Sequence, residues 1–298
     1  MWKLYATAQG CLKTLSATLQ NFVGKSINTI ELGFLSAIVI GTVQMIGGLI
    51  GVVGSSRRQT LRVLFPNNAV FWAIGFGLTA GIFGTALSIY TYTLGAEFAA
   101  RTLLFSASIV PGAILGRIFW GAKTDPLGVQ QWIGIALFLV ACWLTLVVAL
   151  SGAIGECFSR KIAEAHISPW TKNFWTGTTT LLANSTIFAV VIMFSTNTMV
   201  ISQQQVFYIG SIAVGLVVVG MTTFMFLSYA GGGTVALKKL ITESLYLITF
   251  TMVGVFAYSQ PFTIGHVIAF TLFFPAFVLL DKEASNFVRS QFTRLKPV

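Results

Sequence analysis

The sequence predicts an all-α polytopic membrane protein with ten transmembrane helices arranged as two inverted five-helix repeats. Three observations predict this fold class. First, 55% of the 298 residues are hydrophobic and only 9% are charged, whereas a soluble domain is about one-quarter charged. Second, apolar runs of about 20 residues, the length that crosses roughly 30 Å of hydrocarbon, recur along the chain. Third, the links between these runs alternate in their content of Lys and Arg, as expected for links on opposite sides of a membrane.

Helices are expected in place of barrel strands. In lipid, only helices and closed barrels satisfy every backbone polar group. A barrel strand alternates apolar and polar residues over about ten positions, but the run 133–150 is apolar on every side. The ten predicted helices span residues 3–23, 31–53, 69–93, 98–120, 128–149, 151–165, 173–195, 206–228, 235–257 and 262–281.

The first predicted helix, residues 3–23, is more polar than the others. It carries Gln9 and Lys13, while Leu12 and Leu15 recur on another side at helical spacing. Such a helix either spans the membrane and lines a polar cavity or lies flat in the interface. Both arrangements remain open at this point.

Glycines are frequent in the second, third and eighth helices. Gly47 and Gly48 lie in the second, Gly81 and Gly84 in the third, and Gly215 in the eighth. Because small residues let helices approach closely in lipid, these helices are expected to form tightly packed pairs.

Charged residues lie in or beside the fourth, sixth, ninth and tenth predicted helices. Glu97 and Arg101 begin the fourth helix at the outer side and are interpreted as boundary anchors. The sixth, 151–165, is short and contains Glu156, and the ninth contains Glu243. The tenth is followed by a basic tail, which is expected in the cytoplasm.

The basic residues predict the orientation of the chain. Most of the 18 Lys and Arg residues fall in alternate links, which are assigned to the inside. We therefore expect a multi-pass protein of the cytoplasmic (inner) membrane with both termini cytoplasmic and no cleaved signal peptide. The net charge of +10 does not indicate nucleic-acid binding, because these residues do not share one solvent face. The inside set includes Arg57, Arg58, Arg62, Arg117, Lys123, Arg160, Lys161, Lys172, Lys238 and Lys239.

The two halves of the chain are weakly similar, with Gly84 aligned to Gly220. The charge pattern is more informative. The link 54–62 is strongly basic, whereas its counterpart 195–205 contains no Lys or Arg. A unit of five helices crosses the membrane an odd number of times, so the second copy must enter upside down. This is the pattern of an inverted-repeat transporter.

At this point the chain resembles the drug/metabolite transporter superfamily, specifically its EamA-like members. The clearest stretch is Ser108 to Leu144, with a proline, a small-residue helix, a short basic link, Gln131 and Gly134. The family's usual acidic residue after the fourth helix is absent, since Ala122 stands there. The resemblance implies a first EamA-like repeat at 1–149, a second at 150–284 and a cytoplasmic basic tail at 285–298.

Intramembrane ionisable groups are the first candidates for a site, because a charge in lipid costs about 2.5–3.5 kcal/mol. Glu156 is either a substrate or proton site or the partner of Arg160, one helical turn away. Glu243 has the same two interpretations, with Lys239 as its local partner. Lys13 is placed to meet an anionic group or one of these carboxylates.

Aromatic side chains are the second set of candidates. Tyr90 and Tyr246 could stack on a substrate or donate a hydrogen bond to it, although packing is the commoner role. No metal site or cofactor is expected, because His166 and His266 have no partners at ligand spacing.

The resulting hypothesis is a secondary active transporter of a small organic metabolite, working by alternating access as a monomer or homodimer in the lipid bilayer. Coupling to a proton and coupling to a counter-solute are both open. Because Lys13 is the only intramembrane lysine that the segmentation offers, an amphipathic or neutral solute is expected over a polyanion. The alternatives are a membrane-embedded enzyme, for which convergent His, Asp and Glu are lacking, and a non-transporting assembly subunit.

Overall fold

The computed structural model describes residues 1–55, 64–65, 69–95, 109–124, 146–165, 167–196 and 198–259, and the single residues 262, 264, 267 and 271. Within these residues every regular element is a helix. The helices are α1 (Trp2–Lys25), α2 (Ile30–Ser55), α4 (Ala69–Leu78), η1 (Thr79–Ala86), α5 (Leu87–Thr93), α7 (Ile109–Thr124), α9 (Leu146–Glu164), α10 (Pro169–Phe194), α11 (Gln204–Ala230) and α12 (Val235–Tyr258).

Five segments of the described chain are long and apolar enough to cross a membrane, which makes this a membrane protein by helix length and composition. Together with the helical content, they confirm the coarse prediction of an all-α protein with several membrane helices. The five segments are Ile30–Ser55, Val70–Thr93, Pro169–Phe194, Gln204–Ala230 and Ile241–Tyr258.

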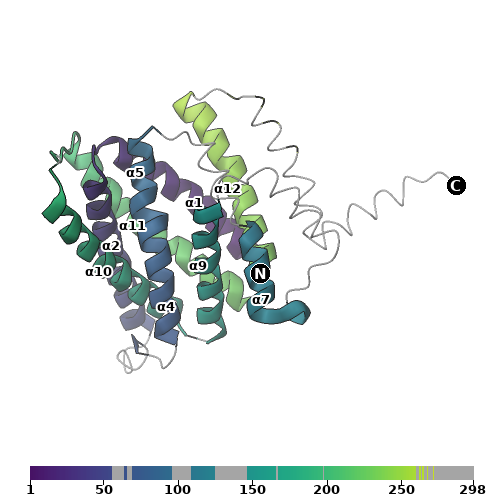
Figure 1. The fold of residues 1–298 in the computed structure, drawn as a ribbon. Coiled ribbons are helices and arrows are strands. Elements are labelled where there is room, and N and C mark those ends of the chain that lie inside the picture. Colours follow the sequence, from purple (N-terminus) through teal and green to yellow (C-terminus); the bar gives the residue numbers. More distant parts are fainter. Residues whose placement is uncertain are drawn as a thin grey trace.

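The helices form one bundle (Figure 1). In this view α2 and α10 lie side by side at the left, and α7 and α12 lie together at the right. Between them, α1 packs along α11 and α12, and α9 packs along α4 and α7. Several polar side chains of α1, including Gln9 and Ser16, are buried in this bundle; Gln20, for example, accepts a hydrogen bond from Ser88 of α5 at 2.9 Å.

Four predicted helices are confirmed to within about two residues at each end. The segments 3–23, 31–53, 206–228 and 235–257 correspond to α1, α2, α11 and α12. The apolar and glycine pattern was sufficient for these helices, because each is bounded by a short polar link.

Two predicted boundaries are wrong. The seventh helix was expected from residue 173, but α10 begins at Pro169, because the Ser168 hydroxyl accepts a hydrogen bond from the Trp170 amide at 3.2 Å and caps the helix. A break was expected at 149–151, but α9 runs through it from Leu146. No proline interrupts this stretch, and the small residues there are tolerated in a packed helix.

The helix predicted over 69–93 is interrupted by a π-helical segment, η1. The Thr85 hydroxyl donates to the carbonyl of Ala80, five residues back, at 3.1 Å. Such widened turns recur at functional sites. The predicted segments 98–108, 128–145 and most of 262–281 lie outside the described residues.

The expectation of close packing at glycines is confirmed where α2 meets α10. A Cβ on Gly48 would lie 2.2 Å from the amide nitrogen of Phe174, and one on Gly177 would lie 2.2 Å from that of Met45. The two backbones therefore touch, which only glycine permits.

One end of the bundle is tied by the links α1–α2 and α10–α11. Ile27 forms a β-bridge with Ile201, and the Ser202 amide donates to the Ser26 carbonyl at 2.9 Å. These contacts join segments far apart in sequence and fix the ends of the four helices next to one another.

Candidate functional site

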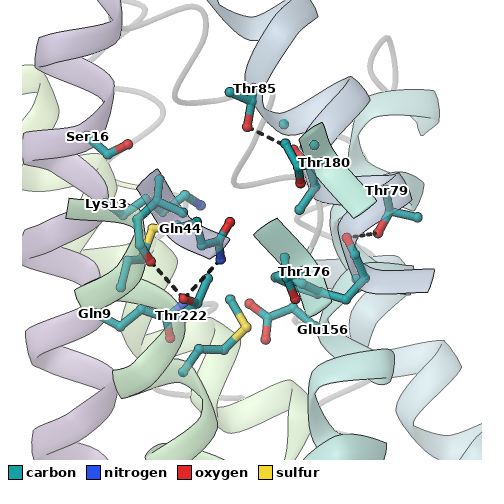
Figure 2. A pocket seen from close by; sticks show the side chains of 18 of the residues that line it. Gln9, Lys13, Ser16, Gln44, Thr79, Thr85, Glu156, Thr176, Thr180 and Thr222 are labelled. Atoms are coloured by element: carbon teal, nitrogen blue, oxygen red, sulfur yellow. Dashed lines mark hydrogen bonds between the residues drawn. The ribbon is translucent and has the colours of Figure 1, made fainter. Parts of the chain in front are cut away.

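A cavity of about 160 Å³ lies inside the bundle, and α1, α2, η1, α9, α10, α11 and α12 all contribute to its wall. A single water needs about 10–15 Å³ on this scale, so the cavity has room for a solute of roughly ten non-hydrogen atoms. Figure 2 shows its polar side chains, with Gln9, Lys13 and Ser16 of α1 across from Thr79, Thr176 and Thr180.

The neutral part of the wall is rich in amides and hydroxyls. Gln44 donates to Asn173 at 3.1 Å, and its amide is 3.5 Å from the hydroxyl of Thr222. Two buried atoms on the wall, the Gln9 Oε1 and the Thr176 Oγ1, have no hydrogen-bond partner within the described chain. Buried polar atoms are nearly always satisfied, so these two mark a part of the wall where polar groups lack partners among the described residues.

The π-helical segment η1 shapes one side of the cavity. Thr79, Ala80, Gly81, Gly84 and Thr85 all line it. A Cβ at Gly84 would have no atom within 4 Å, so this position borders open space. The absence of a side chain at Gly84 therefore leaves room for the cavity, whereas a Cβ at Gly81 would lie 2.5 Å from the hydroxyl oxygen of Thr180.

Glu156 of α9 is one of the two carboxylates on the wall. The Lys238 Nζ donates to both of its oxygens at 2.7 Å, and the Tyr229 hydroxyl also donates to it. The local partner considered from the sequence, Arg160, instead donates to Glu164 at 3.2 Å. The pairing of Glu156 is therefore long-range and joins α9, α11 and α12.

Glu243 of α12 is the other carboxylate on the wall, and two lysines share it. The Lys239 Nζ lies 3.4 Å from Oε1, one helical turn away, and the Lys13 Nζ donates to Oε2 from α1. Both pairings that the sequence analysis considered for Glu243 are thus present. The Lys13 Nζ also lies 4.5 Å from the ring centre of Tyr246, a favourable cation–π contact.

The structure brings four of the five predicted site residues to one cavity. Lys13, Glu156, Glu243 and Tyr246 line it. Tyr90 lies on α5, half-buried, and is not part of the described lining.

Three lysines that the sequence analysis assigned to cytoplasmic links are buried instead. Lys172, Lys238 and Lys239 are all at most 2% exposed. Lys172 lies in the first turn of α10, and its Nζ donates to the Ser159 hydroxyl at 2.7 Å and lies 4.4 Å from the ring centre of Phe76. Lys13 is therefore joined by three further lysines that are buried among the described helices.

Two sequence signals could have located these lysines. The predicted helix 235–257 already contained Lys238 and Lys239, so they should not have been counted in a link. The Ser168–Pro169 pair is a helix-start signal that would have moved Lys172 into α10. Neither signal shows which way the side chain turns, because that depends on the partner carboxylate and hydroxyl.

Comparison with known proteins identifies a similar fold. No family model matches the chain, and no curated protein matches it. A solved structure described only as "Crystal structure of protein" is similar, with a TM-score of 0.60, covering 94% of this chain and 98% of that chain. The two sequences are 17% identical, so the likeness concerns the fold alone. Function must be argued from the cavity.

Proposed function

We propose that this protein is a secondary carrier that moves a small organic metabolite across the cytoplasmic membrane by alternating access. One observation carries the proposal: a polar cavity of about 160 Å³ lies within a bundle of apolar helices. A bundle that only packs in lipid gains nothing from a hollow lined by polar side chains such as Gln9 and Thr176 and by two paired carboxylates, because burying polar groups is unfavourable. A cavity that holds a polar solute would account for these side chains.

An inverted repeat is part of the proposal, and the packing of the helices supports it. The proposed repeat exchanges α1 with α9, α2 with α10, α4–α5 with α11, and α7 with α12. Under this exchange the contact of α1 with α11 becomes that of α9 with α4, and the contact of α1 with α12 becomes that of α9 with α7. The pairs α2–α10 and α7–α12 map onto themselves, as elements beside a two-fold axis would.

The proposal retains the resemblance to EamA-like transporters, the cytoplasmic termini and a spanning α1. The burial of Gln9, Ser16 and Gln20 supports a spanning α1, because a helix lying in the interface would turn these side chains to water. The protein would then act as a carrier, not as an enzyme.

Alternating access would use the contacts of α12. Lys238 joins this helix to α9, and Glu243 joins it to α1. The helices α1 and α9 open the two proposed repeats, so rocking of one repeat against the other must change at least one of these ion pairs. Glu156 or Glu243 is the carboxylate that proton coupling would use; exchange for a counter-solute is the other mode.

Filling the cavity tests the proposal directly. Gly84 borders open space, so Gly84→Phe can place its ring in the cavity without a backbone clash. We expect purified protein in liposomes to catalyse counterflow of at least one metabolite class, and we expect Gly84→Phe to lower the initial rate at least tenfold. The matched control is Gly54→Phe, at an exposed glycine near the end of α2 that also has no atom within 4 Å of an added Cβ.

Each outcome of the counterflow experiment has a distinct meaning. Counterflow that Gly84→Phe abolishes and Gly54→Phe preserves supports the carrier and locates its path. Absence of counterflow for every class of solute, with and without a pH gradient, contradicts the proposal. Equal loss in the two variants indicates that the cavity is not the path.

A further inference from the structure

The ionisable groups in and directly behind the cavity wall are mostly cationic. Four are lysines and two are glutamates, which leaves a formal surplus of two positive charges among the described residues. No side chain of the six is more than about one-fifth exposed, and Lys13 is the most accessible at 20%. The six residues are Lys13, Lys172, Lys238, Lys239, Glu156 and Glu243.

The ion pairs of the two glutamates show where the surplus positive charge lies. Glu156 is fully engaged by Lys238, whose Nζ reaches both of its oxygens. Glu243 is divided between Lys13 and Lys239. One carboxylate therefore serves two ammonium groups at the cavity wall.

Lys172 adds to the same imbalance from behind the wall. Its partners in the described chain are neutral: the Ser159 hydroxyl at 2.7 Å, the Thr222 carbonyl at 3.4 Å and the ring of Phe76. Thr222 and Phe76 themselves line the cavity. A buried ammonium group with no carboxylate among its hydrogen-bond partners is unfavourable, so a negative charge in the cavity would stabilise this arrangement.

We propose that the cavity binds a small organic anion, whose carboxylate or phosphate group is held between Lys13 and Lys239 in competition with Glu243. Ammonium groups are compact charges with three donors each, which suits either kind of anion. Gln9, Gln44 and Thr176 also line the cavity, so amide and hydroxyl side chains surround the rest of the solute. The inference rests on the proposed carrier function and specifies its substrate class.

Binding to the purified full-length protein tests the charge requirement. The probes are succinate, inorganic phosphate, the neutral isostere succinamide and the cation 1,4-diaminobutane, compared by calorimetry at one salt concentration. We expect succinate or phosphate to bind at least tenfold more tightly than succinamide, and the diamine to bind least. Preference for carboxylate over phosphate, or the reverse, distinguishes the two anion types. Equal binding of succinate and succinamide, or binding of neither anion, overturns the inference.

Three variants test the site. Lys13→Met should weaken anion binding at least tenfold, and Lys13→Arg should restore most of it. Glu243→Gln should tighten anion binding at least threefold, because it removes the competing carboxylate; a purely structural Glu243 predicts no gain. Lys161→Met is the matched control, because this α9 lysine pairs with Glu164 and does not line the cavity. Folding of each variant is checked by its elution as a single species. A decrease in affinity for Glu243→Gln, with folding intact, contradicts the competition.

Transport of the same four solutes separates this inference from the carrier proposal. Anion binding without flux leaves the anion site standing and removes the carrier function. Flux of succinamide or the diamine without flux of the anions leaves the carrier standing and removes the anion site.

Discussion

Two buried carboxylates, Glu156 and Glu243, both lie against lysines of α12, yet their surroundings differ. Glu156 receives two hydrogen bonds of 2.7 Å from Lys238, which is completely buried. Glu243 is shared by two lysines, and one of them, Lys13, is 20% exposed and lines the cavity. A carboxylate held at both oxygens by one fully buried lysine favours a fixed contact between helices, whereas a carboxylate divided between two lysines of the cavity wall can exchange its partner. The comparison assigns a structural role to Glu156 and a solute-binding role to the Glu243 cluster.

The largest effect is expected when the pair between Glu156 and Lys238 is broken. Lys238→Met should destabilise the folded protein by about 3 kcal/mol, because it leaves the Glu156 carboxylate buried without its main partner. The measurement is thermal unfolding in detergent. The double variant Lys238→Met with Glu156→Gln should recover most of the loss, because it replaces the pair by neutral groups of similar size. No loss in the single variant would mean that this pair is not the tight contact described.

A lysine-to-methionine substitution at the Glu243 cluster should destabilise the protein less. Lys13→Met should cost about 1.5 kcal/mol, since Lys239 still faces Glu243 when the hydrogen bond from Lys13 to this charged group is lost. Thermal unfolding under the same conditions gives the comparison. If Lys13→Met destabilised the protein as much as Lys238→Met, the two carboxylates would be equally structural and the distinction between them would fail.

The sequence predicted the members of these clusters better than their partners. Lys13, Glu156 and Glu243 were identified because a charge in an apolar segment is rare, and the Lys239–Glu243 contact followed from helical spacing. Glu156 was given Arg160 as its partner by the same spacing, whereas its actual partner is 82 residues away. Helical periodicity predicts neighbours on one helix only. Contacts between helices depend on how the helices pack, which the sequence pattern does not give.

The fold, like the ion pairs, was predicted only in part from the sequence. Apolar length predicted α2, α11 and α12 almost to their ends, because hydrocarbon thickness fixes the length of a spanning helix. The π-helical segment η1 was not predicted, because the residues Thr79–Ala86 have no local pattern that separates a widened turn from an α-helix. Its shape depends on the neighbouring helices and on the cavity.

The smallest effect is expected for Tyr229→Phe, which tests the structural role assigned to Glu156. Tyr229→Phe removes one hydroxyl that donates to this carboxylate and leaves the two bonds from Lys238 intact. An interhelical hydrogen bond in a membrane protein contributes about 0.6 kcal/mol on average, so the unfolding temperature should fall only slightly. Tyr208→Phe, at a tyrosine that is 47% exposed on α11, is the control for loss of a hydroxyl alone. Anion affinity should stay within twofold of the wild type, because the Lys13–Lys239 cluster is untouched. A large loss of affinity in Tyr229→Phe would instead place Glu156 in the solute site, and the two carboxylates would have to act together.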